Sequence, residues 1–106
     1  MTNVFVSSKK IIVEGHSGYE TRGKDIVCAF ISTLTYSTYN YLLDAGNDVE
    51  MEENDARIEI KINKLNDVGK RMIKSFHKMV KEVENDYKNY IRSCYNEEIR
   101  EIGKIC

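Results

Sequence analysis

The hydrophobic and polar positions of this chain repeat with two periods, and the first is the period of a β-strand. Residues 3–7 and 10–14 are short runs of β-forming side chains with polar residues between them, which predicts a β-hairpin. Hydrophobic residues within 49–51 and 58–62 then alternate with charged ones. That alternation predicts a second, half-buried antiparallel hairpin that turns near the Asn54-Asp55 pair.

Two longer segments have the period of an α-helix. The first begins after Asp25, whose carboxylate can accept hydrogen bonds from the N–H groups of the first turn, and it ends near Gly46. Its predicted apolar face consists of Val27, Phe30, Ile31, Leu34, Tyr41 and Leu42. The second begins at Asn66 or Asp67. Its predicted apolar stripe consists of Met72, Phe76, Met79, Val80, Val83 and Tyr87.

These elements predict a single domain over residues 1–106 with the order ββαββα. Residues 90–94 predict a further C-terminal strand, and residues 96–106 suit either a helix or a loose tail. The expected fold class is α/β of the α+β type, with two layers in which two helices cover one face of a largely antiparallel sheet. A chain of 106 residues leaves room for one hydrophobic core.

Composition and charge exclude several classes of protein. With 42% hydrophobic and 31% charged residues, the chain has the composition of an ordinary soluble globular protein. A net charge of −1 gives no overall attraction to nucleic acid or anionic lipid, so we expect no direct nucleic-acid partner and no membrane partner. Because no apolar run could span a bilayer and the N-terminus lacks a secretory signal pattern, we expect a cytoplasmic protein.

The cysteines and histidines set limits on metal and redox chemistry. Cys28, Cys94 and Cys106 form no Cys-x-x-Cys pair, which predicts reduced thiols rather than a disulfide framework. Cys94 and Cys106 also lack metal-ligand spacing with His16 and His77, so we expect no metal and no cofactor. His77 lies between core positions of the second helix and is expected at the surface or its boundary.

Cys28 and His16 are the candidates for chemistry. Cys28 falls in the first turn of the first predicted helix, where unbonded N–H groups favour the thiolate. His16 lies in a glycine-flanked loop between a strand and this helix, and such a connection can return over the helix N-terminus. A thiolate beside an imidazole is the basic requirement for acyl transfer, and helix-end N–H groups could stabilise the oxyanion. The structural alternative is a buried apolar cysteine and a turn histidine.

The sequence segments around His16 and Cys28 resemble the motifs of a known protein family. The run 15–19 (GHSGY), followed by 23–29 (GKDIVCA) with Ser32 and Leu34, is similar to the motifs of the ribosomal-processing cysteine protease family called Prp. The resemblance implies that His16 and Cys28 form the catalytic dyad. It also implies that the loop between them adapts to the substrate, and the loop residues concerned are Gly15, Ser17, Gly18, Tyr19 and Gly23.

Asp25 and Ser32 are candidates for supporting roles. Asp25 is either the helix cap alone or also an orienter of His16. Ser32 falls on the serine of the family, one helical turn after Cys28. It either supports the site or bonds a helix carbonyl, as buried helix hydroxyls commonly do.

The resemblance further implies a substrate and an assembly state. Members of the family remove a short N-terminal extension from a large-subunit ribosomal protein, the twenty-seventh, by cutting after a pair of aromatic residues, and they act as homodimers. This chain departs from the family at Phe30 and Ile31, which are bulkier than the residues usual after the cysteine. The family resemblance therefore predicts a ribosomal protein partner, a second copy of the chain and no cofactor.

Two other functions compete with the protease. A non-catalytic, ribosome-associated module could use the same loop to bind a peptide, but it would not need both His16 and Cys28. A thiol-transfer protein would need a resolving thiol, for which Cys94 is the internal candidate. The acidic face at Glu50 and Glu52 is either solvated or a contact for a basic substrate. The tyrosines Tyr36, Tyr39 and Tyr41 belong either to the core or to an oligomer interface.

Overall fold

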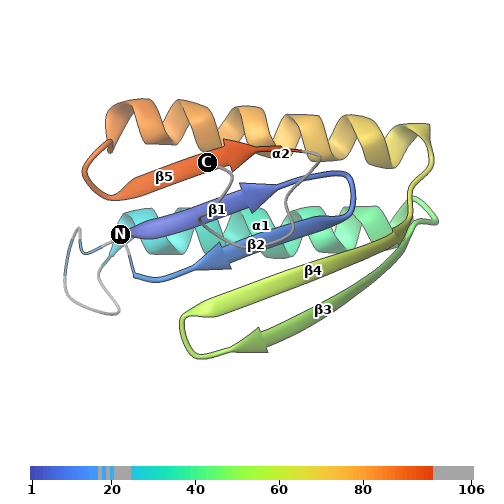
Figure 1. The fold of residues 1–106 in the computed structure, drawn as a ribbon, viewed down its shortest axis with the longest axis horizontal. Helices are drawn as coiled ribbons and strands as arrows, with labels where there is room; N and C mark the ends of the chain where they lie inside the picture. The colour runs from blue at the N-terminus through green and yellow to red at the C-terminus, as the bar shows by residue number, and fades with distance from the viewer. Residues whose placement is uncertain (17, 19, 21–24, 97–106) are drawn as a thin grey trace.

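The structure is a computed structural model that describes residues 1–16, 18, 20 and 25–96, and these residues form a sheet of five strands with two helices (Figure 1). The elements are β1 (Thr2–Val6), β2 (Lys10–Glu14), α1 (Ile26–Asp44), β3 (Asp48–Asn54), β4 (Arg57–Lys64), α2 (Asp67–Asp86) and β5 (Ile91–Tyr95). The predicted order ββαββα and the further C-terminal strand are both confirmed. The tail 97–106 lies outside the described residues.

The strands are arranged in the order β3-β4-β2-β1-β5. Three of the four pairings are antiparallel, and β5 pairs with β1 in parallel. The prediction of a largely antiparallel sheet is therefore confirmed. The pair is parallel because the long helix α2 carries the chain back along the strand direction, so that β5 begins at the same end of the sheet as β1.

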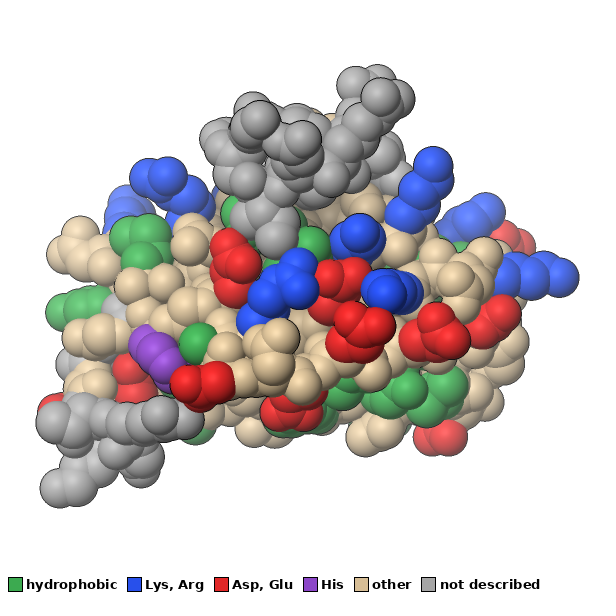
Figure 2. Space-filling view, turned by 60° about the horizontal axis from the view of Figure 1, so that its bottom comes forward, with side chains coloured by type: hydrophobic (Ala, Val, Ile, Leu, Met, Phe, Trp, Pro, Cys, Tyr) green, Lys and Arg blue, Asp and Glu red, His purple; other side chains and the backbone are tan. Residues whose placement is uncertain are grey.

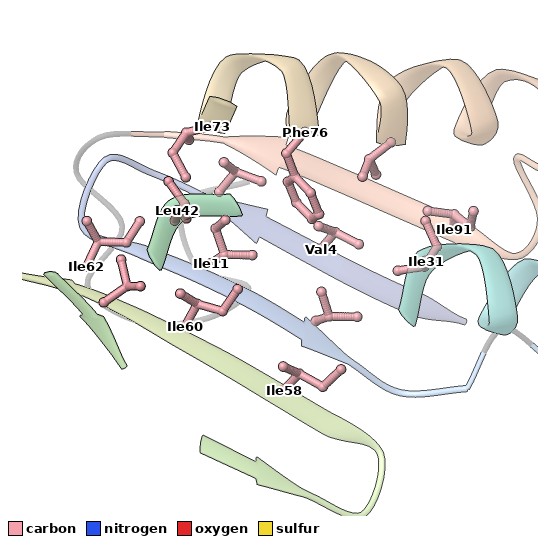
Figure 3. Packing of buried hydrophobic residues seen from close by; sticks show 14 of the residues in the cluster. Val4, Ile11, Ile31, Leu42, Ile58, Ile60, Ile62, Ile73, Phe76 and Ile91 are labelled. Atoms are coloured by element: carbon pink, nitrogen blue, oxygen red, sulfur yellow. The ribbon is translucent and has the colours of Figure 1, made fainter. Parts of the chain in front are cut away.

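Both helices pack on the same face of the sheet and enclose a single hydrophobic core. Side chains alternate between the two faces of each strand, so every second residue of β1, β2 and β4 points toward the helices. Figure 3 shows these side chains converging from the strands and from both helices. They include Val4, Ile11, Ile31, Leu42, Ile58, Ile60, Ile62, Ile73, Phe76 and Ile91.

The predicted apolar faces of the helices are partly wrong. Phe30, Tyr41 and Met79 remain 37%, 62% and 39% exposed, whereas Thr35 and Thr38 are buried. The Thr35 hydroxyl donates to the carbonyl of Ile31 at 2.7 Å, which satisfies a polar group inside the core. Periodicity identifies the side of a helix that is apolar, but the width of the buried stripe depends on how far the sheet extends beneath it.

Side-chain caps fix where the two helices begin. Asn66 rather than Asp67 caps α2, because the Asn66 side chain accepts from the N–H of Gly69 at 2.8 Å. Helix α1 is followed by Gly46, whose φ of +83° is a backbone conformation that glycine adopts readily. Among the described residues, neither helix is long and apolar enough to cross a bilayer.

Candidate active site

Asp25 determines the position of Cys28 at the start of α1. Its backbone is extended, and its buried carboxylate accepts from the N–H groups of Val27 and Cys28, both at 3.0 Å. The predicted cap is confirmed. Cys28 therefore lies in the first helical turn, partly buried, with a thiol rather than a disulfide.

The same two bonds bear on which groups can form the predicted oxyanion hole. The sequence predicted that helix-end N–H groups stabilise the developing charge. In the structure, the N–H groups of Val27 and Cys28 already donate to Asp25. Neither is available to a substrate while the cap is formed, so an oxyanion must draw on other donors of the site.

His16 and Cys28 line the same cavities. One cavity, of about 470 Å³, extends from this pair toward the sheet, where Val13 of β2 and Ile58 of β4 contribute to its wall. A second cavity, of about 430 Å³, extends toward the start of α1 and is lined by residues that include Asp25 and Ala29. Ser32 lines both cavities as well. The structure thus brings together three of the residues predicted from the sequence: His16 from the strand-to-helix loop, and Cys28 and Ser32 from helix α1.

The strand register explains how the loop residue reaches this place. β2 and β4 pair so that Glu14 lies opposite Arg57, and the chain therefore leaves β2 beside the turn that joins β3 to β4. The N–H of Gly15 donates to the carbonyl of Ala56 in that turn at 2.8 Å. Gly15 has a φ of +87°, and a Cβ on it would lie 2.4 Å from the carbonyl oxygen of Met1. Only glycine fits there without displacement, and His16 follows directly.

Helix α1 presents a ridge of three residues to the larger cavity. Cys28, Ser32 and Tyr36 are spaced by four residues, so they lie one above another on the same helix face, and all three line this cavity. The Tyr36 hydroxyl donates to the carboxylate of Glu53 near the end of β3. This hydrogen bond, with lesser contributions from burial and from the charge of Glu53, raises the pKa of Tyr36 above 10.0. Tyr36 is therefore a protonated donor at neutral pH.

Sequence reasoning missed Tyr36 and the whole β3–β4 side of the site. Glu53, Asp55 and Arg57 also line the larger cavity. A turn near residues 54 and 55 was predicted, but nothing in the sequence indicates that β4 pairs with β2, and that pairing brings the turn to His16. The one available signal was the i, i+4, i+8 spacing of Cys28, Ser32 and Tyr36 on a predicted helix.

The charged residues near the site form ion pairs. Arg57, which lines the larger cavity, contacts Glu59 at 2.9 Å and Glu14 at 3.7 Å. On the exposed face of the same hairpin, Lys61 binds Glu52 at 2.9 Å. That hydrogen bond and the charge attraction lower the pKa of Glu52. Figure 2 shows acidic and basic side chains mixed over the β3–β4 side, so the acidic run of β3 meets lysine and arginine rather than standing alone.

The remaining residues of the predicted loop are only partly described. Gly18, with a φ of +75°, lines the second cavity, as does Glu20. Ser17, Tyr19 and Gly23 lie outside the described residues. The expectation that they contact a substrate stays a prediction.

The expectation of three reduced cysteines is wrong for Cys94. Cys94 is disulfide-bonded, whereas Cys28 is not. Cys94 lies in β5, opposite Phe5 of β1. Strands β2 and β1 lie between β4 and β5 in the sheet. Spacing in the sequence does not show which thiols meet in space, since disulfide formation depends on Cα separation and side-chain direction. Within the described residues, no group of three or more His, Cys, Asp or Glu side chains is arranged to hold a metal ion.

Comparison with known proteins identifies the family. The family model described as cysteine protease Prp matches residues 1–92. The chain belongs to the Prp family of cysteine proteases. Membership of the Prp family covers β1 to the start of β5, and therefore both sides of the candidate site. None of the curated proteins matches the chain.

Solved structures support the fold of a Prp protein. A structure of an essential ribosomal processing protease Prp from S. aureus, in complex with a covalently linked product peptide, superposes with a TM-score of 0.83 at 21% identity. A second structure of the S. aureus Prp, with a substrate peptide, gives a TM-score of 0.77 at 20% identity. Both matches cover 91% of this chain and 100% of the other. A protein from Streptococcus mutans gives 0.68 at 18% identity, covering 89% of this chain and 90% of the other.

Proposed function

We propose that this Prp-family protein is an endopeptidase in which Cys28 is the nucleophile and His16 is the general base. The observation that carries the proposal is that His16 and Cys28 line both cavities of the site. Cys28 offers a partly buried thiol in the first turn of a helix. His16 is exposed, so its imidazole is accessible to a substrate.

The reaction uses each group twice. His16 takes the proton of the Cys28 thiol, and the thiolate attacks the carbonyl carbon of the scissile peptide bond. When the tetrahedral intermediate collapses, the C–N bond breaks, the imidazolium gives its proton to the leaving amine, and a thioester remains. Water then gives a proton to His16 and attacks the thioester carbonyl, and the C–S bond breaks. The imidazolium returns its proton to the Cys28 sulfur, which restores the thiol, and the new carboxylic acid ionises in solvent.

The two cavities suit a peptide that crosses Cys28. A chain laid over the sulfur can place the residues before the scissile bond in one cavity and those after it in the other. Ser32 lines both cavities close to that crossing. We assign its hydroxyl a supporting role as a donor to the developing oxyanion, because the cap occupies the N–H groups of Val27 and Cys28. Asp25 supports the site by fixing the start of α1.

The proposed substrate is the N-terminal extension of a large-subunit ribosomal protein, the twenty-seventh. Support comes from family membership and from the S. aureus structures, which are of a ribosomal processing protease with substrate and product peptides. Cleavage supports ribosome maturation in this proposal, which places the protein in the cytoplasm. The partner is a peptide, and no nucleic-acid contact is needed.

The decisive experiment measures cleavage and binding together. The protein is mixed with the extended ribosomal protein, and the products are identified by mass spectrometry. Cys28→Ala should reduce cleavage by at least about 10³-fold, because no other group replaces the nucleophile. Binding of a fluorescent extension peptide should remain. If Cys28→Ala cleaves at the wild-type rate, the nucleophile assignment is wrong. If the wild type binds the peptide but never cleaves it, the alternative of a non-catalytic peptide-binding module is correct.

We also propose that the protein acts as a homodimer. Tyr41 is 62% exposed on α1 and lines a shallow apolar cavity with Met79 of α2, and exposed aromatic residues are enriched at interfaces. Light scattering during size-exclusion chromatography should give twice the chain mass of 12.3 kDa. A mass equal to that of one chain at micromolar concentration would remove the dimer from the proposal.

A further inference from the structure

The β3–β4 hairpin, at and beside its turn, is hydrogen-bonded to the two elements that carry the candidate dyad. On one side, the Tyr36 hydroxyl of α1 donates to the Glu53 carboxylate. On the other, the carbonyl of Ala56 accepts from the N–H of Gly15 at 2.8 Å. Tyr36 lies on the helix that carries Cys28, and Gly15 immediately precedes His16. The turn is therefore a physical link between the elements that hold the sulfur and the imidazole.

We propose that Tyr36 and Glu53 are positioning residues that hold His16 beside Cys28 through the β3–β4 turn. The inference rests on the proposed dyad and goes beyond it, because neither residue reacts with the substrate. The hydrogen bond between Tyr36 and Glu53 holds the β3–β4 hairpin against α1. The carbonyl of Ala56 in the turn of that hairpin then fixes the backbone at Gly15. Loss of the bond lets the turn and the Gly15 backbone move away from the helix, and His16 moves with them.

Each link of this chain is stiff. Cys28 and Tyr36 are two helical turns apart on one ridge of α1, so their relative positions are set by the helix. Ala56 has a φ of +60°, an uncommon conformation for a non-glycine residue, which defines the course of the turn. Gly15 packs closely on the carbonyl of Met1, which leaves no room for a side chain at that position. A displacement at Glu53 is therefore transmitted rather than absorbed.

A second contact reinforces the link without replacing it. Arg57, at the end of the turn, lies 3.7 Å from Glu14, the residue before Gly15. This ion pair joins β4 to β2, whereas the Tyr36–Glu53 hydrogen bond joins the end of β3 to α1. The Tyr36 hydroxyl is protonated throughout the neutral range, as for any tyrosine, so the donor is always present.

The test uses the reactivity of Cys28, and it needs no substrate. Iodoacetamide alkylates the thiolate, forming an S–C bond with loss of iodide, and mass spectrometry of the Cys28 peptide follows the rate from pH 5 to pH 9. An imidazolium beside the sulfur keeps this rate high at acidic pH. His16→Ala defines the rate without that partner. Tyr36→Phe and Glu53→Ala should lower the rate at pH 6 by about threefold or more, toward the rate of His16→Ala.

Two further variants separate positioning from a general loss of structure. Glu53→Gln keeps an acceptor oxygen for Tyr36 and should restore most of the wild-type rate. Glu52→Gln removes the neighbouring carboxylate, whose partner is Lys61 on the exposed face, and should leave the alkylation profile unchanged. Thermal unfolding of every variant confirms that the fold is retained; a purely structural role would lower the unfolding temperature without moving the pH profile.

The outcomes distinguish this inference from the proposed function. If His16→Ala slows alkylation but Tyr36→Phe and Glu53→Ala follow the wild type, the dyad stands and the positioning role is wrong. If His16→Ala itself follows the wild type, the dyad fails and the positioning role fails with it. The inference would be established by slow alkylation of Cys28 in Tyr36→Phe and Glu53→Ala, together with alkylation near the wild-type rate in Glu53→Gln and Glu52→Gln.

Discussion

The amide N–H of Cys28 donates to the carboxylate of Asp25 at 3.0 Å. This bond assigns Asp25 the role of a cap that places the sulfur at the helix start. It also removes the Cys28 N–H from the groups that could stabilise an oxyanion. Of the two roles considered for Asp25, the cap is therefore confirmed, and the orientation of His16 stays a prediction.

Asp25→Ala should destabilise the protein. Loss of the cap leaves the N–H groups of Val27 and Cys28 without their acceptor and costs about 1 kcal/mol of unfolding free energy. Asp25→Asn keeps an acceptor oxygen and should recover most of that stability. Urea unfolding measures both variants. Equal stability of Asp25→Ala and the wild type would show that the cap does not hold the helix start.

Gly15→Ala should be more harmful than Gly18→Ala. Both positions have positive φ, which costs an alanine about 1 kcal/mol or more. A Cβ at Gly15 would also meet the carbonyl oxygen of Met1 at 2.4 Å, whereas none of the residues that the structure describes lies within 4 Å of one at Gly18. Thermal unfolding should therefore show a larger decrease for Gly15→Ala. The reverse order, or equal decreases, would contradict the tight packing of Gly15.

Ser32→Ala should reduce turnover without weakening peptide binding. If its hydroxyl donates to the oxyanion, kcat falls by about 10²-fold while KM stays near the wild-type value. Thr33→Ala, at the exposed neighbouring position, is the matched control and should be neutral. Steady-state kinetics on an extension peptide measure both. An unchanged kcat in Ser32→Ala would assign the oxyanion hole to other groups.

Glu84 should make the free energy of unfolding depend on pH under acidic conditions. Burial raises its pKa, but hydrogen bonds from the Ser93 hydroxyl at 2.5 Å and the Ser93 N–H at 2.8 Å, together with Lys81, more than offset burial and lower the pKa below 4.5. A carboxyl with a depressed folded-state pKa contributes stability that is complete above its unfolded value near 4.5. That contribution is lost as the pH falls through the folded-state value.

Glu84→Gln tests this contribution. The variant should be less stable than the wild type near pH 7 by roughly 0.5–1 kcal/mol, a discounted figure because the carboxylate is partly exposed. The difference should shrink toward pH 3. Glu82→Gln, two residues earlier and exposed, provides the control. Unfolding free energies measured from pH 3 to pH 8 would refute the assignment if the two stability curves stayed parallel.

Much of the fold was predictable because periodicity is a local property. Residues 10–14 become a strand because they are a short run of β-forming side chains, and residues 58–62 because their side chains alternate in polarity. Asp25 begins a helix because a carboxylate there satisfies the first N–H groups. The position of Cys28 in the first turn follows from that cap. The final strand was also predictable from its own residues. Its parallel pairing with β1 was not, because a parallel and an antiparallel pairing would bury the same residues of this strand.

The sequence by itself determined the two periods, the caps and the motif that contains His16 and Cys28. Only the tertiary structure decided that β4 lies beside β2, which brings the turn at Ala56 to Gly15 and makes Glu53 a neighbour of Tyr36. The physical reason is that strand pairing is chosen by burying a shared apolar face among segments far apart in the chain. That choice depends on all the strands at once, and no single segment of the sequence records it.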